Sequence, residues 1–157
     1  MTQLPESIWK RRLDSEFDEM RSSGARFEAN ADRTQYKLFL SGDALYRDGG
    51  AIRKRSAHEV LIKLKREYPY PSGIEVTWLT PIFHPNIREN DGKVCILLVN
   101  DWAEGQTVKN VVDALRQLLE NPNPDSPLNR EAAQYLLKNP GEFGLTPVEK
   151  KGPRVVA

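Results

Sequence analysis

The only cysteine of the chain, Cys95, is the residue with the clearest chemical potential, and it closes a long irregular segment. That segment reads FHPNIRENDGKVCILL over residues 83–98 and includes His84 and Asn86. Loops of this length inside a compact domain are often functional. A cysteine thiolate is both a good nucleophile and a good leaving group, which suits acyl transfer. The apolar residues around Cys95 are equally typical of a buried structural thiol, so the residue types leave both interpretations open.

A cysteine hydrolase would need a histidine to take the proton of the thiol. The chain offers two, His58 and His84, and the sequence does not tell whether either ring reaches Cys95. A metal site built from two histidines and one cysteine would have no recognisable ligand spacing. The phosphate-binding motifs GxxxxGK[ST] and GxGxxG do not occur. We therefore expect no metal and no cofactor.

The composition narrows the class of protein. The 157 residues suit one domain, and 23 basic against 22 acidic residues give a net charge of +1. This balance argues against a nucleic-acid-binding protein, and a lone cysteine is compatible with a reducing compartment. The charged N-terminus lacks the apolar core of a signal peptide, and no apolar run approaches the roughly 20 residues that span a bilayer. We expect a cytoplasmic monomer with no membrane or nucleic-acid partner.

Hydrophobic periodicity predicts a helix followed by strands. Apolar residues recur at spacings of three and four on one face of the first element: Trp9, Leu13, Phe17 and Met20. Four short segments then have strand character: RFEAN, QYKLFLSG, HEVLIKLKREY and IEVTWLT. The stretch DALYRDGG between the second and third reads as a turn-rich connection. With no helix between them, these strands favour an antiparallel meander.

Two helices are predicted after the irregular segment. TVKNVVDALRQLLE is strongly amphipathic, and Ser126-Pro127 suits the start of a second helix with Ser126 as its N-cap. The fold class is therefore α+β: an N-terminal helix, a four-stranded antiparallel meander, a long active-site loop and two C-terminal helices. We expect one domain over residues 1–143 and a short flexible tail over residues 144–157.

Several motifs in this order resemble the ubiquitin-conjugating enzymes, which carry ubiquitin-like modifiers as thioesters. They are YPYPSGIEVTWLTPIFHPNI, GKVCILL, DW and NPNPDSPLN, and the similarity is strongest from Tyr68 to Phe143. The resemblance implies a catalytic domain over residues 1–143 that takes a modifier from an activating enzyme onto Cys95 and transfers it to a substrate lysine. It implies no cofactor in this chain, because the activating enzyme uses the ATP. The alternative is a non-catalytic variant that binds a modifier or a ligase, and Cys95 at the motif position disfavours it.

The resemblance also implies roles for the residues around Cys95, the nucleophile. Asn86 would donate its amide to the oxyanion formed as lysine attacks, or stiffen the loop by bonding to backbone. His84 would order the loop rather than act as a base. Ser126 stands at a gate position where many members have aspartate, and its other interpretation is the N-cap. Asp125, one residue earlier, is the candidate substitute for that carboxylate.

The same resemblance implies partner-binding residues at the other end of the chain. A basic patch on the first helix would dock the activating enzyme, although a solvated face is the ordinary interpretation of such a patch: Lys10, Arg11 and Arg12. Tyr70 and the loop Ala103-Glu104-Gly105, which follows Trp102, would face a RING-type ligase, although this loop lacks the usual Ser-Pro-Ala of the family. The segment from Asn86 to Cys95 is one residue longer than the usual family spacing, and GGAIRKRSAHEVLIK is longer than the usual hairpin. We therefore expect a divergent, compact member.

Overall fold

The computed structural model describes residues 3–94, 102–125 and 127–143. Helix α1 (Glu6–Ser22) is followed by strands β1 (Arg26–Ala29), β2 (Gln35–Asp48), β3 (Ala51–Leu64) and β4 (Ile74–Trp78). Helices α3 (Val108–Glu120) and α4 (Arg130–Lys138) and the short 3-10 helix η1 (Pro140–Phe143) complete the chain. None of the helices within these described ranges is both long and apolar enough to cross a membrane.

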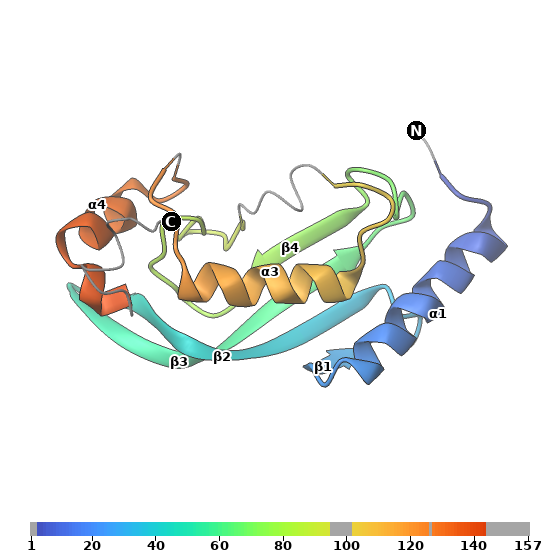
Figure 1. Cartoon of the computed structure of the whole chain (residues 1–157), viewed down its shortest axis with the longest axis horizontal. Coiled ribbons are helices and arrows are strands. Elements are labelled where there is room, and N and C mark those ends of the chain that lie inside the picture. Colours follow the sequence, from blue (N-terminus) through green and yellow to red (C-terminus); the bar gives the residue numbers. More distant parts are fainter. Residues whose placement is uncertain (1–2, 95–101, 126, 144–157) are drawn as a thin grey trace, which may run out of the picture.

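The four strands form one antiparallel sheet in the order β1-β2-β3-β4, so the predicted α+β meander is confirmed. Helix α3 lies across one face of the sheet, α1 packs at the end near β1, and α4 lies over the far end of the β2–β3 hairpin (Figure 1). The helices at the two ends are thus far apart, and α3 bridges the space between them. The irregular segment after β4 passes between α3 and α4 and leads toward Cys95.

The core follows from alternation in the strands and helical periodicity in α1 and α3. One face of the sheet buries every second residue of three strands: Tyr36, Leu38, Leu40, Val60, Ile62, Leu64, Ile74, Val76 and Trp78. Helix α3 buries its apolar stripe on the same core: Val108, Val111, Val112, Leu115 and Leu119. In α1, Leu13 and Met20 are buried and Trp9 and Phe17 pack beside them, as the spacing predicts.

The β2–β3 hairpin is longer than predicted. The turn-rich connection expected over DALYRDGG is wrong for most of its length, because β2 continues to Asp48 and the turn is confined to Gly49 and Gly50. Gly49 has φ 61°, which suits glycine in a tight hairpin turn. Pairing continues past a register shift between Ser41 and Ala44. The extension is stabilised by a second apolar cluster that it forms with α4 and with the segment after β4: Leu45, Phe83, Ala132 and Leu136.

The second C-terminal helix starts later than predicted. Helix α4 begins at Arg130, and the side chain of its N-cap, Asn129, accepts a hydrogen bond from the Ala132 N–H (3.0 Å). The prediction that Ser126 caps this helix is therefore wrong, and Ser126 itself lies outside the described residues. The N–H groups of Leu128 and Asn129 both donate to the Pro85 carbonyl, at 2.9 and 3.1 Å. These bonds hold the approach to α4 against the irregular segment. The predicted tail over residues 144–157 also lies outside the described residues.

Candidate functional site

His84 anchors the irregular segment from inside the protein. Its ring is buried, Nδ1 accepts the Asn86 backbone N–H (3.0 Å), and Nε2 lies 2.9 Å from the Leu118 carbonyl of α3. Since a carbonyl only accepts, this network assigns the ring proton to Nε2. Burial lowers the pKa of His84 to about 4, so the ring is neutral near pH 7. Both nitrogens are occupied, which fits a role in ordering the loop.

Asn86 ties the same loop to the segment that follows α3. Its side chain is 5% exposed and makes two hydrogen bonds to the backbone of Asn123: Nδ2 donates to the carbonyl (2.9 Å), and Oδ1 accepts the N–H (2.8 Å). The amide is therefore fixed in one orientation. Nδ2 carries a second hydrogen, which has no acceptor among the described residues. Loop support and donation to a reacting oxygen are thus compatible in one side chain.

The turn after Asn86 is held by its own hydrogen bonds. The Arg88 guanidinium binds both oxygens of Asp91, at 3.0 and 2.7 Å, and this lowers the pKa of Asp91 to about 2. The Arg88 N–H donates to the Lys93 carbonyl (2.8 Å), and the Gly92 N–H donates to the Arg88 carbonyl (2.8 Å). The one-residue insertion noted in the sequence is therefore accommodated in a compact turn.

Gly92 and Val94 fix the end of this turn against the rest of the protein. The Gly92 carbonyl accepts the Trp78 N–H (2.8 Å), and a Cβ on Gly92 would lie 2.0 Å from the Trp78 oxygen. The φ of Gly92 is 76°, which also favours glycine. Val94 is buried and forms an antiparallel bridge with Ile87. The chain is thus positioned up to the residue before Cys95, and Cys95 itself lies outside the described residues.

Asn123 connects Asn86 with the predicted gate. Besides its backbone bonds to Asn86, it accepts the Asp125 N–H on its side-chain oxygen (2.9 Å). Asp125 is exposed, and the gate residue Ser126 lies outside the described residues. The structure therefore brings His84, Asn86 and Asp125 together through Asn123, a residue that sequence analysis did not single out. Its position in the proline-rich NPNPDSP stretch, just after a helix, is the signal that could have identified it.

The predicted basic patch of α1 does not form one exposed face. Arg12 is 25% exposed, and its Nη2 donates to the carbonyls of Glu104 (3.0 Å) and Gln106 (2.7 Å). Lys10 is exposed and pairs with Glu6, and Arg11 is exposed. Arg12 therefore holds the loop before α3, while Lys10 and Arg11 remain on the surface.

A buried carboxylate, Glu16, lies under this loop. It is 2% exposed and accepts hydrogen bonds from Arg12 Nε (3.0 Å), the Tyr68 hydroxyl and the Val108 N–H (3.0 Å). Burial, followed by the charge of Glu16, raises the pKa of Tyr68, which stays a donor. These bonds connect α1, the loop at Tyr68 and the first turn of α3.

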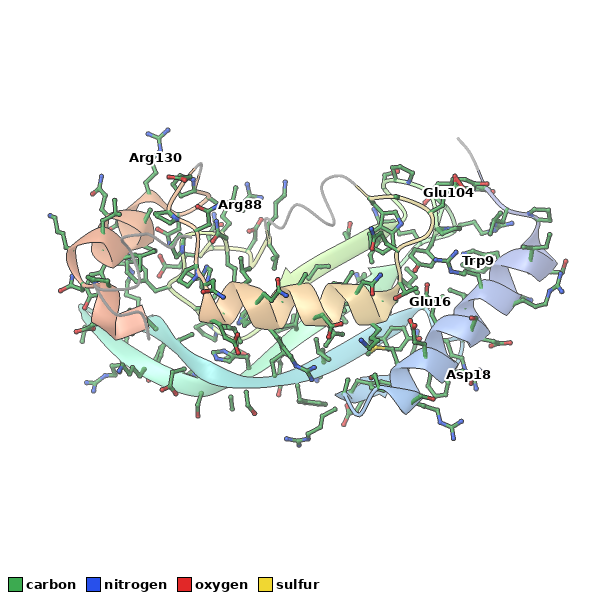
Figure 2. All side chains as sticks on the ribbon, in the orientation of Figure 1. Trp9, Glu16, Asp18, Arg88, Glu104 and Arg130 are labelled. Carbon is green, nitrogen blue, oxygen red and sulfur yellow. The ribbon has the colours of Figure 1, made fainter. Side chains whose placement is uncertain are left out.

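The remaining partner-binding candidates differ in exposure. Trp102 is only 5% exposed, donates its Nε1–H to the Pro69 carbonyl (2.9 Å) and packs on Tyr68. It therefore supports the predicted partner-binding surface from the interior of the protein. Tyr70 is half-buried and Glu104 is exposed. Figure 2 shows Glu104 at the α1 end of the molecule, far from Arg88 and Arg130. Within residues 3–94, 102–125 and 127–143, no group of three or more His, Cys, Asp or Glu side chains could hold a metal ion.

Comparison with known proteins gives consistent matches. Residues 12–149 match the family model described as ubiquitin-conjugating enzyme. A Dictyostelium discoideum "Ubiquitin conjugating enzyme E2 B" is 34% identical over 64% of this chain and 67% of its own length. A Drosophila melanogaster "Nedd8-conjugating enzyme UbcE2M" is 34% identical over 71% of this chain and 58% of its own. An Arabidopsis thaliana "Ubiquitin-conjugating enzyme E2 3" is 32% identical over 81% of this chain and 79% of its own.

Solved structures agree on the fold. A Toxoplasma gondii ubiquitin conjugating enzyme E2 domain superposes with a TM-score of 0.68 at 22% identity, over 85% of this chain and 90% of that one. Saccharomyces cerevisiae Ubc12 superposes with a TM-score of 0.66 at 26% identity, over 85% of this chain and 74% of that one.

Proposed function

Because this chain belongs to the ubiquitin-conjugating enzyme family, we propose that it is an active conjugating enzyme with Cys95 as its acceptor. It takes ubiquitin or a ubiquitin-like modifier from an activating enzyme and transfers it to a lysine of a protein substrate. The names of the similar proteins include both ubiquitin and Nedd8 conjugation, so both modifiers are candidates.

The first step is an exchange of thioesters. The Cys95 thiolate attacks the carbonyl that joins the C-terminal glycine of the modifier to the activating enzyme. The tetrahedral intermediate collapses, the cysteine of the activating enzyme leaves as a thiolate, and the modifier is now joined to Cys95. Thiolate nucleophile and thiolate leaving group are matched, so the exchange needs no metal or cofactor in this chain.

The second step is aminolysis. The neutral amine of a lysine attacks the Cys95 thioester, negative charge develops on the carbonyl oxygen, and the Cys95 thiolate leaves. The amine passes one proton to water as the isopeptide bond forms. A donor aimed at the oxyanion in such a step stabilises the transition state by about 3 kcal/mol. We assign this donor to the second Nδ2 hydrogen of Asn86.

The observation that carries the proposal is the pair of hydrogen bonds between the Asn86 amide and the Asn123 backbone. They fix an amide donor in the loop that leads through Val94 into Cys95, and Asn123 joins that loop to Asp125. His84, with both ring nitrogens occupied by neutral groups, supports the loop and takes no part as a base. Asp125 and Ser126 then orient the incoming lysine, and removal of water from around the amine favours its neutral form.

Partner binding belongs to the opposite end of the molecule. There, Lys10 and Arg11 of α1 are exposed, and the loop bearing Glu104 lies beside them because Arg12 holds it. We assign docking of the activating enzyme and of a RING-type ligase to this surface, with Tyr70 and Glu104 at its rim. Trp102 contributes by supporting the loop.

The test is formation of a thioester. The protein is incubated with ATP, an activating enzyme and its modifier, once with ubiquitin and once with Nedd8, and the products are run on a non-reducing gel. We expect a band that thiol reductant removes, that Cys95→Ala abolishes and that Cys95→Ser converts to a reductant-resistant ester. If the folded protein gives no band with either matched set, the non-catalytic binding variant becomes the better interpretation.

A further inference from the structure

Arg47 joins three segments that meet beside the candidate site. It lies on the distal half of β2, and its guanidinium binds both oxygens of Glu89 at 2.9 and 3.1 Å. The same Nη2 also reaches Glu131 at 3.2 Å. Glu89 belongs to the turn between Asn86 and Val94, whereas Glu131 lies in the first turn of α4. One side chain of the long hairpin thus bridges the loop before Cys95 and the helix after the gate.

The guanidinium is itself well placed to hold this geometry. It lies over the ring of buried Phe83, 4.8 Å from the centroid, and the Phe83 N–H donates to the Leu45 carbonyl (2.7 Å). The side chains of Arg47 and Glu89 are each 35% exposed, so their pairing contributes little to the free energy of unfolding. A planar guanidinium that binds a carboxylate at two points nevertheless fixes the direction of its partner. The contact is suited to orientation rather than to stability.

The two segments that Arg47 connects also line an open surface cavity. Its volume is about 340 Å³, and its lining comes from both sides: Arg88, Glu89, Asn90, Leu128, Asn129, Arg130 and Glu131. Leu128 and Asn129 also bind the Pro85 carbonyl, next to Asn86. The width of this cavity therefore depends on the distance between the Glu89 turn and the start of α4, which Arg47 spans.

We propose that Arg47 is a positioning residue for lysine transfer, holding the Glu89 turn to α4 and so setting the width of the cavity beside Asn86. This inference rests on the proposed function and deepens it. Among the described residues Arg47 binds Glu89 and Glu131, and it acts through them. Because the acceptor amine must be placed closely while the modifier arrives already bound, the contact serves discharge onto lysine rather than loading.

The test compares Arg47→Ala, Glu89→Gln and the double variant with a matched control, Arg53→Ala. Arg53 lies on the same hairpin and is paired with Asp48 (2.8 Å), also on that hairpin. Each protein is loaded with modifier, and single-turnover discharge is followed over a range of free lysine concentrations. We expect Arg47→Ala to load within about two-fold of the wild type and to discharge about 10-fold more slowly, with a weaker apparent affinity for lysine. The double variant should be no slower than Arg47→Ala, and Arg53→Ala should match the wild type.

Arg47→Lys keeps the charge but loses the two-point contact, so it provides a milder variant with an intermediate rate. Discharge by folded Arg47→Ala at the rate of Arg53→Ala would overturn the proposal.

A second readout does not depend on activity. Hydrogen–deuterium exchange should become faster in Arg47→Ala across residues 87–94 and at the start of α4, and should stay unchanged there in Arg53→Ala. If the wild type forms no thioester, the proposed function fails and this exchange experiment alone decides whether Arg47 holds the two segments. Unchanged exchange in Arg47→Ala overturns the positioning role.

Discussion

Two buried polar networks lie at opposite ends of this protein, and they use different chemistry. The site network consists of His84, Asn86 and the backbone of Leu118 and Asn123, and all of its groups are neutral. The α1 network is centred on the carboxylate of Glu16, which binds Arg12, Tyr68 and the Val108 N–H. Both networks join segments far apart in sequence, but only the α1 network contains buried charge.

The difference has a physical consequence for each end. A neutral network buries amide and imidazole groups at small cost once each hydrogen bond is made, and it keeps its shape at any pH where the imidazole stays neutral. A buried carboxylate is stable only while its donors remain in place. We therefore expect the hydrogen bonds of His84 and Asn86 to persist near and above neutral pH, and the α1 end to depend strongly on a few side chains.

The largest effect is expected from Glu16→Ala. Removing the carboxylate leaves the Val108 N–H and the Tyr68 hydroxyl without their acceptor and frees Arg12 from its partner. The free energy of unfolding should fall by about 4 kcal/mol, as for other broken buried ion pairs, measured by urea denaturation. Asp14→Ala is the matched control on the same helix, since its pair with Arg33 is exposed and should contribute no more than about 1 kcal/mol. An equal loss of unfolding free energy in the two variants would contradict this prediction, because Glu16 would then contribute no more than an exposed ion pair.

The pH dependence of the free energy of unfolding should reveal the contribution of buried His84. Its pKa in the folded protein is about 4, against 6.5 unfolded, so the unfolded state binds more protons between these values. Its contribution to stability is therefore complete above about pH 6.5 and is lost as the pH falls toward 4, with a total change of about 3 kcal/mol. We expect His84→Gln to be less stable near pH 7 but to show a shallower slope, measured by denaturation between pH 4 and 7. His58, whose pKa burial also lowers, is present in both proteins. Parallel slopes would mean that His84 is already protonated or exposed.

A smaller effect is expected at the start of α4. Asn129→Ala removes the N-cap bond to Ala132 and should lower the free energy of unfolding by about 1 kcal/mol. Ser126→Ala should leave stability unchanged, because the helix begins after it. Urea denaturation of both variants separates the two positions, and a loss in Ser126→Ala equal to that in Asn129→Ala would restore Ser126 as the cap. Slower lysine discharge in a stable Ser126→Ala variant would instead support its role as a gate.

Much of the fold could be predicted because the spacing of apolar residues indicates which side chains are buried. The alternation in Tyr36, Leu38 and Leu40 fixes which face of β2 is inside, and the stripe of α3 fixes what covers it. The outer half of the β2–β3 hairpin was missed because Arg47 and Asp48 are polar and because the pair Gly49-Gly50 is typical of a wider turn. The partner of Leu45 is α4, almost ninety residues later, and local patterns carry no information about such a distant contact.

The site could be predicted as an ordered set of motifs but not as a set of contacts. His84 and Asn86 were identified, whereas their hydrogen-bond partners are carbonyl and N–H groups of Leu118 and Asn123, which backbone position alone determines. Arg12 resembled part of a surface patch because the carbonyls of Glu104 and Gln106 that bind it lie more than ninety residues away.

If the site network serves transfer to lysine, Asn86→Ala should impair that transfer and spare loading of the modifier. Loading of the modifier and single-turnover discharge onto free lysine are measured on the same preparation, with the unfolding curve as a check that the loop still folds. We predict loading within about two-fold of the wild type and discharge slower by about 100-fold, the effect of losing one oxyanion donor. Unchanged discharge, or an equal loss of loading and discharge in a folded protein, would contradict the account.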